Sequence, residues 1–241
     1  MDKLRPLIAI AFSEHRHSWK DADADFFERA QTAKKERRPL EPETLRNLAT
    51  VYKVSRGLRK GKEAEYSRLI FERTRSGWPT GLPERLELLK RIVNEASEGT
   101  DPLTNGSQAS LASKAIWFFY PERWFLYDRF VSAALRIQGA GTLDRACCFE
   151  GQIAELCDSK FLQDLKSNLE KHAPQLHAER VIDKFLMFIG MSLFSCSDPA
   201  TGVAKGAWRR PDESDYAFAD DVYALFESSE LVARLRALSL P

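Results

Sequence analysis

The sequence predicts an all-α fold with two helical lobes. Apolar residues recur at the 3.6-residue spacing of a buried helix face in three windows. Alternating strand patterns are absent, and only the run LIAIAF at 7–12 is ambiguous. With 241 residues and 44% hydrophobic content, the chain can fill a core. We therefore expect a helical molecule with a cleft between its lobes.

Proline and glycine separate the expected helices in chain order. Pro39 and Pro42 precede a helix near 43–58, and the stretch GWPTGLP at 77–83 precedes the next one. A loop at 99–107 and a loop-rich stretch at 195–215 follow. The periodic apolar sets are Leu45, Leu48, Ala49 and Tyr52; Leu82, Leu86, Leu89, Ile92, Val93 and Ala96; and Val181, Ile182, Phe185, Leu186, Ile189 and Leu193.

Composition narrows the class of protein. There is no run of eighteen apolar residues and no export signal, so we expect a cytoplasmic monomer without membrane contact. The cysteines, Cys147, Cys148, Cys157 and Cys196, form no C-x-x-C pair and should be reduced and buried or incidental. His15 and His17 diverge on a helix and lack companion ligands. We expect no metal and no cofactor.

The net charge is only +1, but basic residues gather locally. The range from Lys53 to Arg75 contains eight basic and only three acidic residues, and its pattern predicts a pair of helices. A phosphate-facing surface with Arg56, Arg59 and Lys60 would explain this excess; a solvated helix face is the alternative. Lys205, Arg209 and Arg210 could also touch a DNA backbone, or belong to a solvated loop.

The stretch 105–137 carries the functional argument. It reads as a loop, a helix, a tight turn at Tyr120-Pro121-Glu122, a short apolar approach, and Asp128 at the start of another helix. The first helix places Ala112, Ile116 and Phe119 on one face, and the second places Tyr127, Phe130, Val131, Ala134 and Ile137 on another. Asp128 is a favoured residue type for a helix N-cap, which is its plain structural explanation.

This stretch resembles the helix-hairpin-helix DNA glycosylase superfamily, nearest to the archaeal-type 8-oxoguanine glycosylases. The segment from Ser110 to Lys114 overlies a family helix that begins K-E-A-S-H-F-L, and Leu126 to Val131 overlies I-I-D-R-H-I. Gly106 falls on a hairpin glycine. The resemblance implies a single helical glycosylase-like domain over 1–241. A pattern S-K-x-L-x-x-x-x-P followed by Y-D or L-D is also similar to poorly characterised bacterial proteins, for which a role against modified phage DNA is imaginable.

The resemblance implies that Asp128 is catalytic. A carboxylate there would stabilise the positive charge that develops on the deoxyribose and activate the attacking water. Ser110 stands where the bifunctional enzymes have their Schiff-base lysine, which favours a monofunctional glycosylase. Lys114, one helical turn further on, is the alternative nucleophile or else a structural lysine.

The partner implied is DNA, with the target base flipped from a duplex or taken from a single strand. Most aromatics around the turn should be core, and Trp78 and Trp208 lie in loop-like sequence. The expected substrate or DNA contacts are Gly106, Ser110, Ser113, Trp117, Tyr127, Arg129, Arg56, Arg59, Lys60, Trp78, Arg209 and Arg210. A non-catalytic helical DNA- or protein-binding module is the alternative. A nuclease or toxin-like effector lacks a supporting carboxylate cluster.

Overall fold

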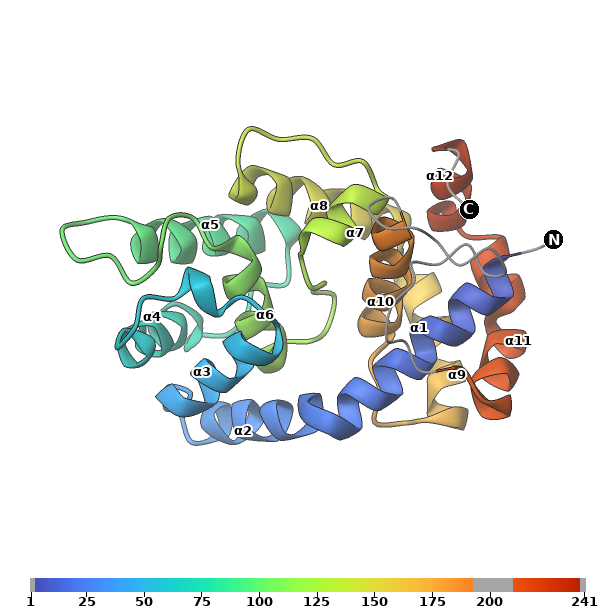
Figure 1. Cartoon of the computed structure of the whole chain (residues 1–241), viewed down its shortest axis with the longest axis horizontal. Coiled ribbons are helices and arrows are strands. Elements are labelled where there is room, and N and C mark those ends of the chain that lie inside the picture. The colour runs from blue at the N-terminus through green and yellow to red at the C-terminus, as the bar shows by residue number, and fades with distance from the viewer. Residues whose placement is uncertain (1–2, 193–209, 239–241) are drawn as a thin grey trace. The chain divides into compact units, whose positions relative to one another are not determined.

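The computed structural model describes residues 3–192 and 210–238, and their regular elements are all helical (Figure 1). The α-helices are α1 Leu4–Ser18, α2 Ala24–Lys35, α3 Pro42–Val51, α4 Glu63–Thr74, α5 Leu82–Ser97, α6 Ala109–Phe119, α7 Arg129–Ala134, α8 Thr142–Leu156, α9 Ser159–His172, α10 Ala178–Ser192, α11 Glu213–Glu227 and α12 Glu230–Ala237. A π-helical turn, Trp19–Asp23, and a 3-10 turn, Ser55–Gly57, complete the set. The all-α expectation is confirmed, and the ambiguous run at 7–12 lies within α1.

The chain divides into two compact units. Unit 1 comprises Met1–Asp21, Asp128–Gln138 and Gly151–Pro241. Unit 2 comprises Ala22–Tyr127 and Gly139–Glu150. One boundary falls between Tyr127 and Asp128, so the chain enters unit 1 at the residue with which the functional argument is most concerned.

Unit 1 is built on α1, which packs against α10 and α11. Residues from Leu7 to Ser13 of α1 are all buried, because this short helix has neighbours on more than one side. Phe12 stacks on Phe218 of α11 with ring centroids 4.1 Å apart. On another part of α10, Gly190 lies against the backbone of Phe130 in α7, where an added Cβ would come within 1.9 Å of the Phe130 carbonyl oxygen.

Unit 2 surrounds α6 with α2, α3 and α5, while α4 packs on α3 and α5 (Figure 1). From Leu111 to Phe119 every residue of α6 is buried, which its apolar composition explains. Gln31 of α2 donates its amide to the Phe118 carbonyl at 2.7 Å, which supplies a partner for the C-terminal end of α6.

Two expected helices are shorter in the structure. The helix expected near 43–58 ends at Val51, where Lys53 takes φ +56° and the Val54 amide donates back to the Ala49 carbonyl. The basic residues from Lys53 to Lys62 therefore lie on a connecting segment rather than on a helix pair. In the same way α7 ends at Ala134, because Arg136 takes φ +50° and directs the chain out of the helix; Ile137 is buried beyond it.

Three further facts bear on the expected class. Among residues 3–192 and 210–238, no helix combines the length and the apolar composition needed to span a bilayer. Cys157 is buried, Cys147 is half-buried and Cys148 is exposed, while Cys196 lies outside the described residues. Burial raises the pKa of the Cys147 thiol to about 11.

Candidate functional site around Asp128

Asp128 is the N-cap of α7. Its backbone is extended, and its Oδ1 accepts hydrogen bonds from the amides of Phe130 at 2.7 Å and Val131 at 3.0 Å. No hydrogen bond within the described residues uses its other carboxylate oxygen, Oδ2. The side chain is half-buried. One oxygen of Asp128 thus caps the helix while the other has no protein partner among those residues.

The segment 125–127, immediately before Asp128, is anchored to α6 by side-chain hydrogen bonds. Ser113 Oγ donates to the Phe125 carbonyl at 3.0 Å and accepts from the Tyr127 amide at 3.1 Å. Ser110 Oγ and Lys114 Nζ both donate to the Tyr127 carbonyl at 3.0 Å. These bonds lock an irregular segment whose backbone groups would otherwise lack partners.

Lys114 is buried with 4% of its surface exposed, and its Nζ also donates to Ser110 Oγ at 2.7 Å. The expectation that Ser110 and Lys114 share a helical face is confirmed by this bond. Ser110 Oγ and Lys114 Nζ donate hydrogen bonds to the Tyr127 carbonyl, and Ser113 Oγ donates to the Phe125 carbonyl. Ser110 and Ser113, expected to contact substrate or DNA, and Lys114, expected as the alternative nucleophile, therefore position the segment that leads into Asp128.

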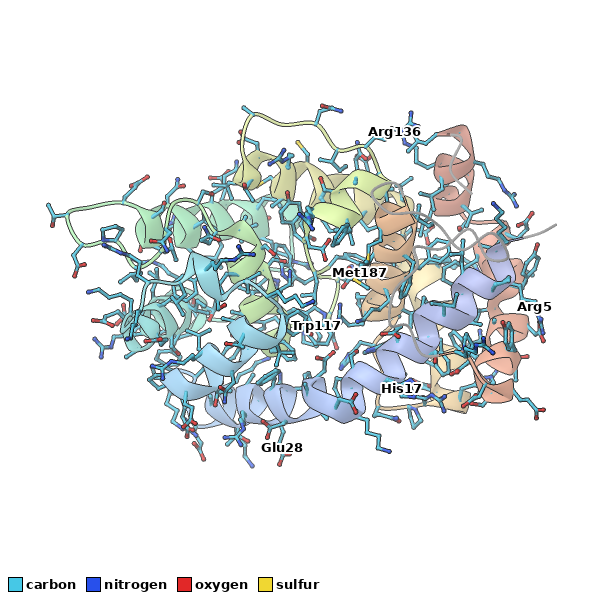
Figure 2. All side chains as sticks on the ribbon, viewed as in Figure 1. Arg5, His17, Glu28, Trp117, Arg136 and Met187 are labelled. Carbon is cyan, nitrogen blue, oxygen red and sulfur yellow. The ribbon has the colours of Figure 1, made fainter. Side chains whose placement is uncertain are left out.

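The aromatic residues expected to contact a base are mostly core. Trp117, labelled in Figure 2, is fully buried. Tyr127 is 3% exposed, and its ring lies 6.0 Å from that of Phe149. Trp78 is half-buried and stacks on Tyr120 with centroids 5.7 Å apart, so its loop-like sequence did not leave it extended into solvent. Trp208 lies outside the described residues.

The basic residues of the segment 53–62 lie against the connection between α5 and α6, residues 98–108, which we call the hairpin. The Arg59 amide donates to the Leu103 carbonyl at 3.0 Å, and the Asn105 amide donates to the Gly57 carbonyl at 2.8 Å. Asn105 Nδ2 also donates to the Arg56 carbonyl. The basic segment 53–62 and the loop that contains Gly106 are thus neighbours. The hydrophobic periodicity of the sequence did not indicate this contact.

The cations on this surface differ in availability. Arg59 donates to the Pro102 carbonyl at 3.1 Å and lies 3.6 Å from Asp101, which Lys62 also contacts. Arg56 and Lys60 are exposed and form no ion pair with any residue that the structure describes. They are the stronger candidates for phosphate contacts.

The hairpin itself presents backbone donors. Gly106 takes φ +72°, a conformation that favours glycine, and within the described chain its amide and that of Ser107 donate no hydrogen bond. Gln108, the N-cap of α6, provides no side-chain cap. The unpaired amides of Gly106 and Ser107 thus lie just before the N-cap, where backbone N–H groups can donate to phosphate oxygens.

The remaining expected contacts are scattered. Arg129 is exposed, and its guanidinium lies 4.6 Å from the centroid of the Phe130 ring. Arg210 is exposed just before α11. Arg209 and Lys205 lie outside the described residues. The structure therefore brings Arg56, Lys60 and Gly106 together within unit 2, whereas Arg129 and Arg210 belong to unit 1.

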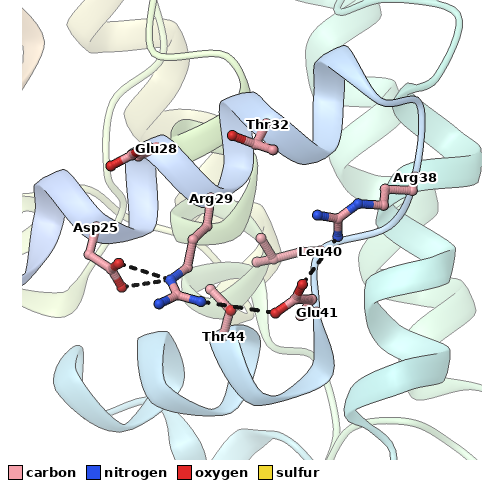
Figure 3. Close-up of a pocket in the computed structure, with 8 residues that line it drawn as sticks. All are labelled: Asp25, Glu28, Arg29, Thr32, Arg38, Leu40, Glu41 and Thr44. Atoms are coloured by element: carbon pink, nitrogen blue, oxygen red, sulfur yellow. Dashed lines mark hydrogen bonds and ion pairs between the residues drawn. The ribbon is translucent and has the colours of Figure 1, made fainter.

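Two surface pockets in unit 2 were not anticipated from the sequence. The first, about 290 Å³, lies between α2 and α3 and contains ion pairs that join Arg29 to Asp25 and Glu41, and Arg38 to Glu41 (Figure 3). The second, about 330 Å³, is lined by Arg46, Ala49, Ser55, Leu58, Lys60 and Glu63. Both depend on how successive helices meet, which periodicity does not reveal.

Within the described ranges, no group of three or more His, Cys, Asp or Glu side chains could hold a metal ion. Comparison of the chain with family models, curated proteins and solved structures finds no match. The site must therefore be interpreted from its own geometry.

Proposed function

We propose that this protein is a DNA glycosylase that hydrolyses the N-glycosidic bond of a damaged or modified base, on a helix-hairpin-helix glycosylase scaffold. The observation that carries the proposal is the state of Asp128. One carboxylate oxygen is fixed by two backbone amides, and the other has no partner among the described residues. A carboxylate held in this way is oriented and can act on a substrate atom.

The chemistry suits such a carboxylate. Cleavage of the glycosidic bond develops positive charge on the deoxyribose, which a negative oxygen stabilises, and Oδ2 can accept a proton from the attacking water. Ser110, Ser113 and Lys114 contribute by holding the backbone of Phe125 and Tyr127, which leads into Asp128.

The DNA surface that we propose consists of Arg56, Lys60 and the hairpin amides of Gly106 and Ser107. Unpaired cations next to unpaired backbone donors provide both charge and directional hydrogen bonds for phosphates. The alternative is a non-catalytic binding module on the same scaffold, in which Asp128 only caps α7. Its N-cap geometry is equally suited to that role.

Asp128→Asn distinguishes the two roles. Asparagine is as good an N-cap as aspartate, so the fold should persist, while loss of the charge should reduce base release by about 10²–10⁴-fold. The measurement is mass spectrometry of free bases released from damaged, alkylated and phage-modified DNAs. Asp158→Asn is the matched control, because Asp158 caps α9 through the Phe161 amide in the same way. Full activity in Asp128→Asn would show that Asp128 serves only as the N-cap of α7.

A further inference from the structure

The pocket of about 330 Å³ in unit 2 borders the proposed DNA surface. Its walls come from α3, from the 3-10 turn at Ser55, and from the start of α4. Leu58, on one wall, pairs as an isolated β-bridge with Thr104 of the hairpin. Lys60 belongs to both the pocket and the proposed phosphate-binding surface. A strand held on that surface would therefore pass the mouth of this pocket.

The lining combines an apolar wall with opposite charges. Ala49 and Leu58, which are 1% and 8% exposed, form the apolar part of the lining, and Leu58 has the larger remaining surface for contact with a base. Lys60 is exposed, with no ion pair among the described residues. The volume lies at the lower end of the roughly 300–1,000 Å³ typical of small-molecule sites.

The distinctive member is Glu63, which is 6% exposed. Arg46 Nε donates to its Oε1 at 2.9 Å, and the backbone amides of Gly61 and Glu63 also stabilise the carboxylate. A carboxylate has about four acceptor positions, so it can accept a further donor. The hydrogen bond from Arg46 holds the pKa of Glu63 below its usual range, so the carboxyl is ionised at neutral pH. An ionised carboxylate accepts hydrogen bonds and donates none.

We propose that this pocket binds one nucleotide of the DNA, with its base against Leu58, an exocyclic amino group donating to Glu63, and its phosphate near Lys60. Cytosine and adenine present such an amino group, whereas thymine presents a carbonyl oxygen that a carboxylate repels. The inference rests on the DNA-binding part of the proposed function. It adds a sequence preference that does not involve Asp128.

The test is a titration of the whole protein with dCMP and with dTMP, followed by the methyl NMR signals of Ala49 and Leu58. We expect dCMP to shift these signals and to bind about tenfold more tightly than dTMP, the ratio expected for one hydrogen bond to a charged acceptor. Glu63→Gln should bring the two affinities close together, because an amide both donates and accepts. Glu65→Gln, on the same helix and outside the pocket, should keep the preference.

A blocking variant provides a second readout. Ser55 is exposed on the pocket rim, so Ser55→Trp should fold and abolish dCMP binding, whereas Ser76→Trp, exposed elsewhere in unit 2, should not. Equal affinities for dCMP and dTMP in the wild type, or shifts confined to other residues, would overturn the proposal. Asp128→Asn should retain the dCMP preference. If the wild type releases no base but still prefers dCMP, the proposed glycosylase function is refuted and the nucleotide-binding pocket is supported.

Discussion

At the scale of single residues, Lys114 separates two kinds of glycosylase chemistry. An amine nucleophile must approach the sugar carbon in its neutral form. The Lys114 Nζ donates to Ser110 Oγ and to the Tyr127 carbonyl, and with 4% of its surface exposed the side chain is not accessible to a sugar carbon. This arrangement favours a positioning role, so water is the expected nucleophile.

Borohydride trapping tests this assignment. Incubation with substrate DNA and borohydride should yield no covalent protein–DNA adduct, and product DNA should stay intact until alkali is added. Lys114→Ala should lower base release, because the Tyr127 carbonyl keeps only the hydrogen bond from Ser110 Oγ, and loss of the buried hydrogen bonds of Lys114 should destabilise the fold by about 1–3 kcal/mol. Lys166→Ala, on the exposed side of α9, is the control. An adduct that forms in the wild type and disappears in Lys114→Ala would establish lyase chemistry.

The sequence predicted part of this residue-level arrangement. The helix start at Asp128 and the shared face of Ser110 and Lys114 follow from residue type and helical spacing, and both are observed. Their common acceptor, the Tyr127 carbonyl, belongs to an irregular segment, and propensities do not fix the path of such a segment. The sequence alone therefore could not show that Ser110 and Lys114 bind the same backbone carbonyl.

At the scale of elements, the contact between α7 and α10 is the tightest feature near the site. Gly190 has no side chain to separate its helix from the Phe130 backbone. The apolar periodicity of 181–189 correctly predicted α10, while Leu193 lies outside the described residues. The pattern did not indicate that a glycine would be the contact point. Periodicity reports which face is buried and not how closely it is approached.

Gly190→Ala should destabilise the protein by about 1–3 kcal/mol, because the new methyl group would overlap a backbone carbonyl that cannot easily move. The matched control is Gly151→Ala in α8, where an added Cβ meets no described atom within 4 Å. Alanine there should stabilise the helix by about 0.5–1 kcal/mol. Denaturant midpoints of the two variants should shift in opposite directions. Equal shifts would mean that α7 and α10 are not in this close contact.

At the scale of the whole molecule, a net charge of +1 gives no general attraction to DNA. Any affinity must come from local groups. Of the eight basic residues between Lys53 and Arg75, Arg59, Lys62 and Arg73 are ion-paired, and the other five form no ion pair with a described residue. The sequence located the basic segment, but it placed the segment on helices. Which of its cations are neutralised by Asp101 depends on a turn from a distant part of the chain.

Arg56→Gln combined with Lys60→Gln should weaken duplex binding and reduce the log–log salt slope by about 0.9 for each phosphate that the variant no longer neutralises. Adding Arg59→Gln should change the slope less, because Arg59 is already held by the Pro102 carbonyl and Asp101. Arg73→Gln with Lys90→Gln removes two cations that are paired with Glu95 and Glu87, and serves as the control. If the first pair leaves the slope unchanged, the DNA surface lies elsewhere, with Arg210 the next candidate.

The chain order of unit 1 has a consequence for protein synthesis. The partners of α1, which are α10 and α11, are translated after all of unit 2. At ~5–20 residues per second, the ribosome needs on the order of ten seconds or more to reach them. During that interval the apolar surface from Leu7 to Phe12 lacks its main packing partners, α10 and α11. We expect the nascent chain to depend on chaperones at this stage, and slower translation of the second half to lower its yield.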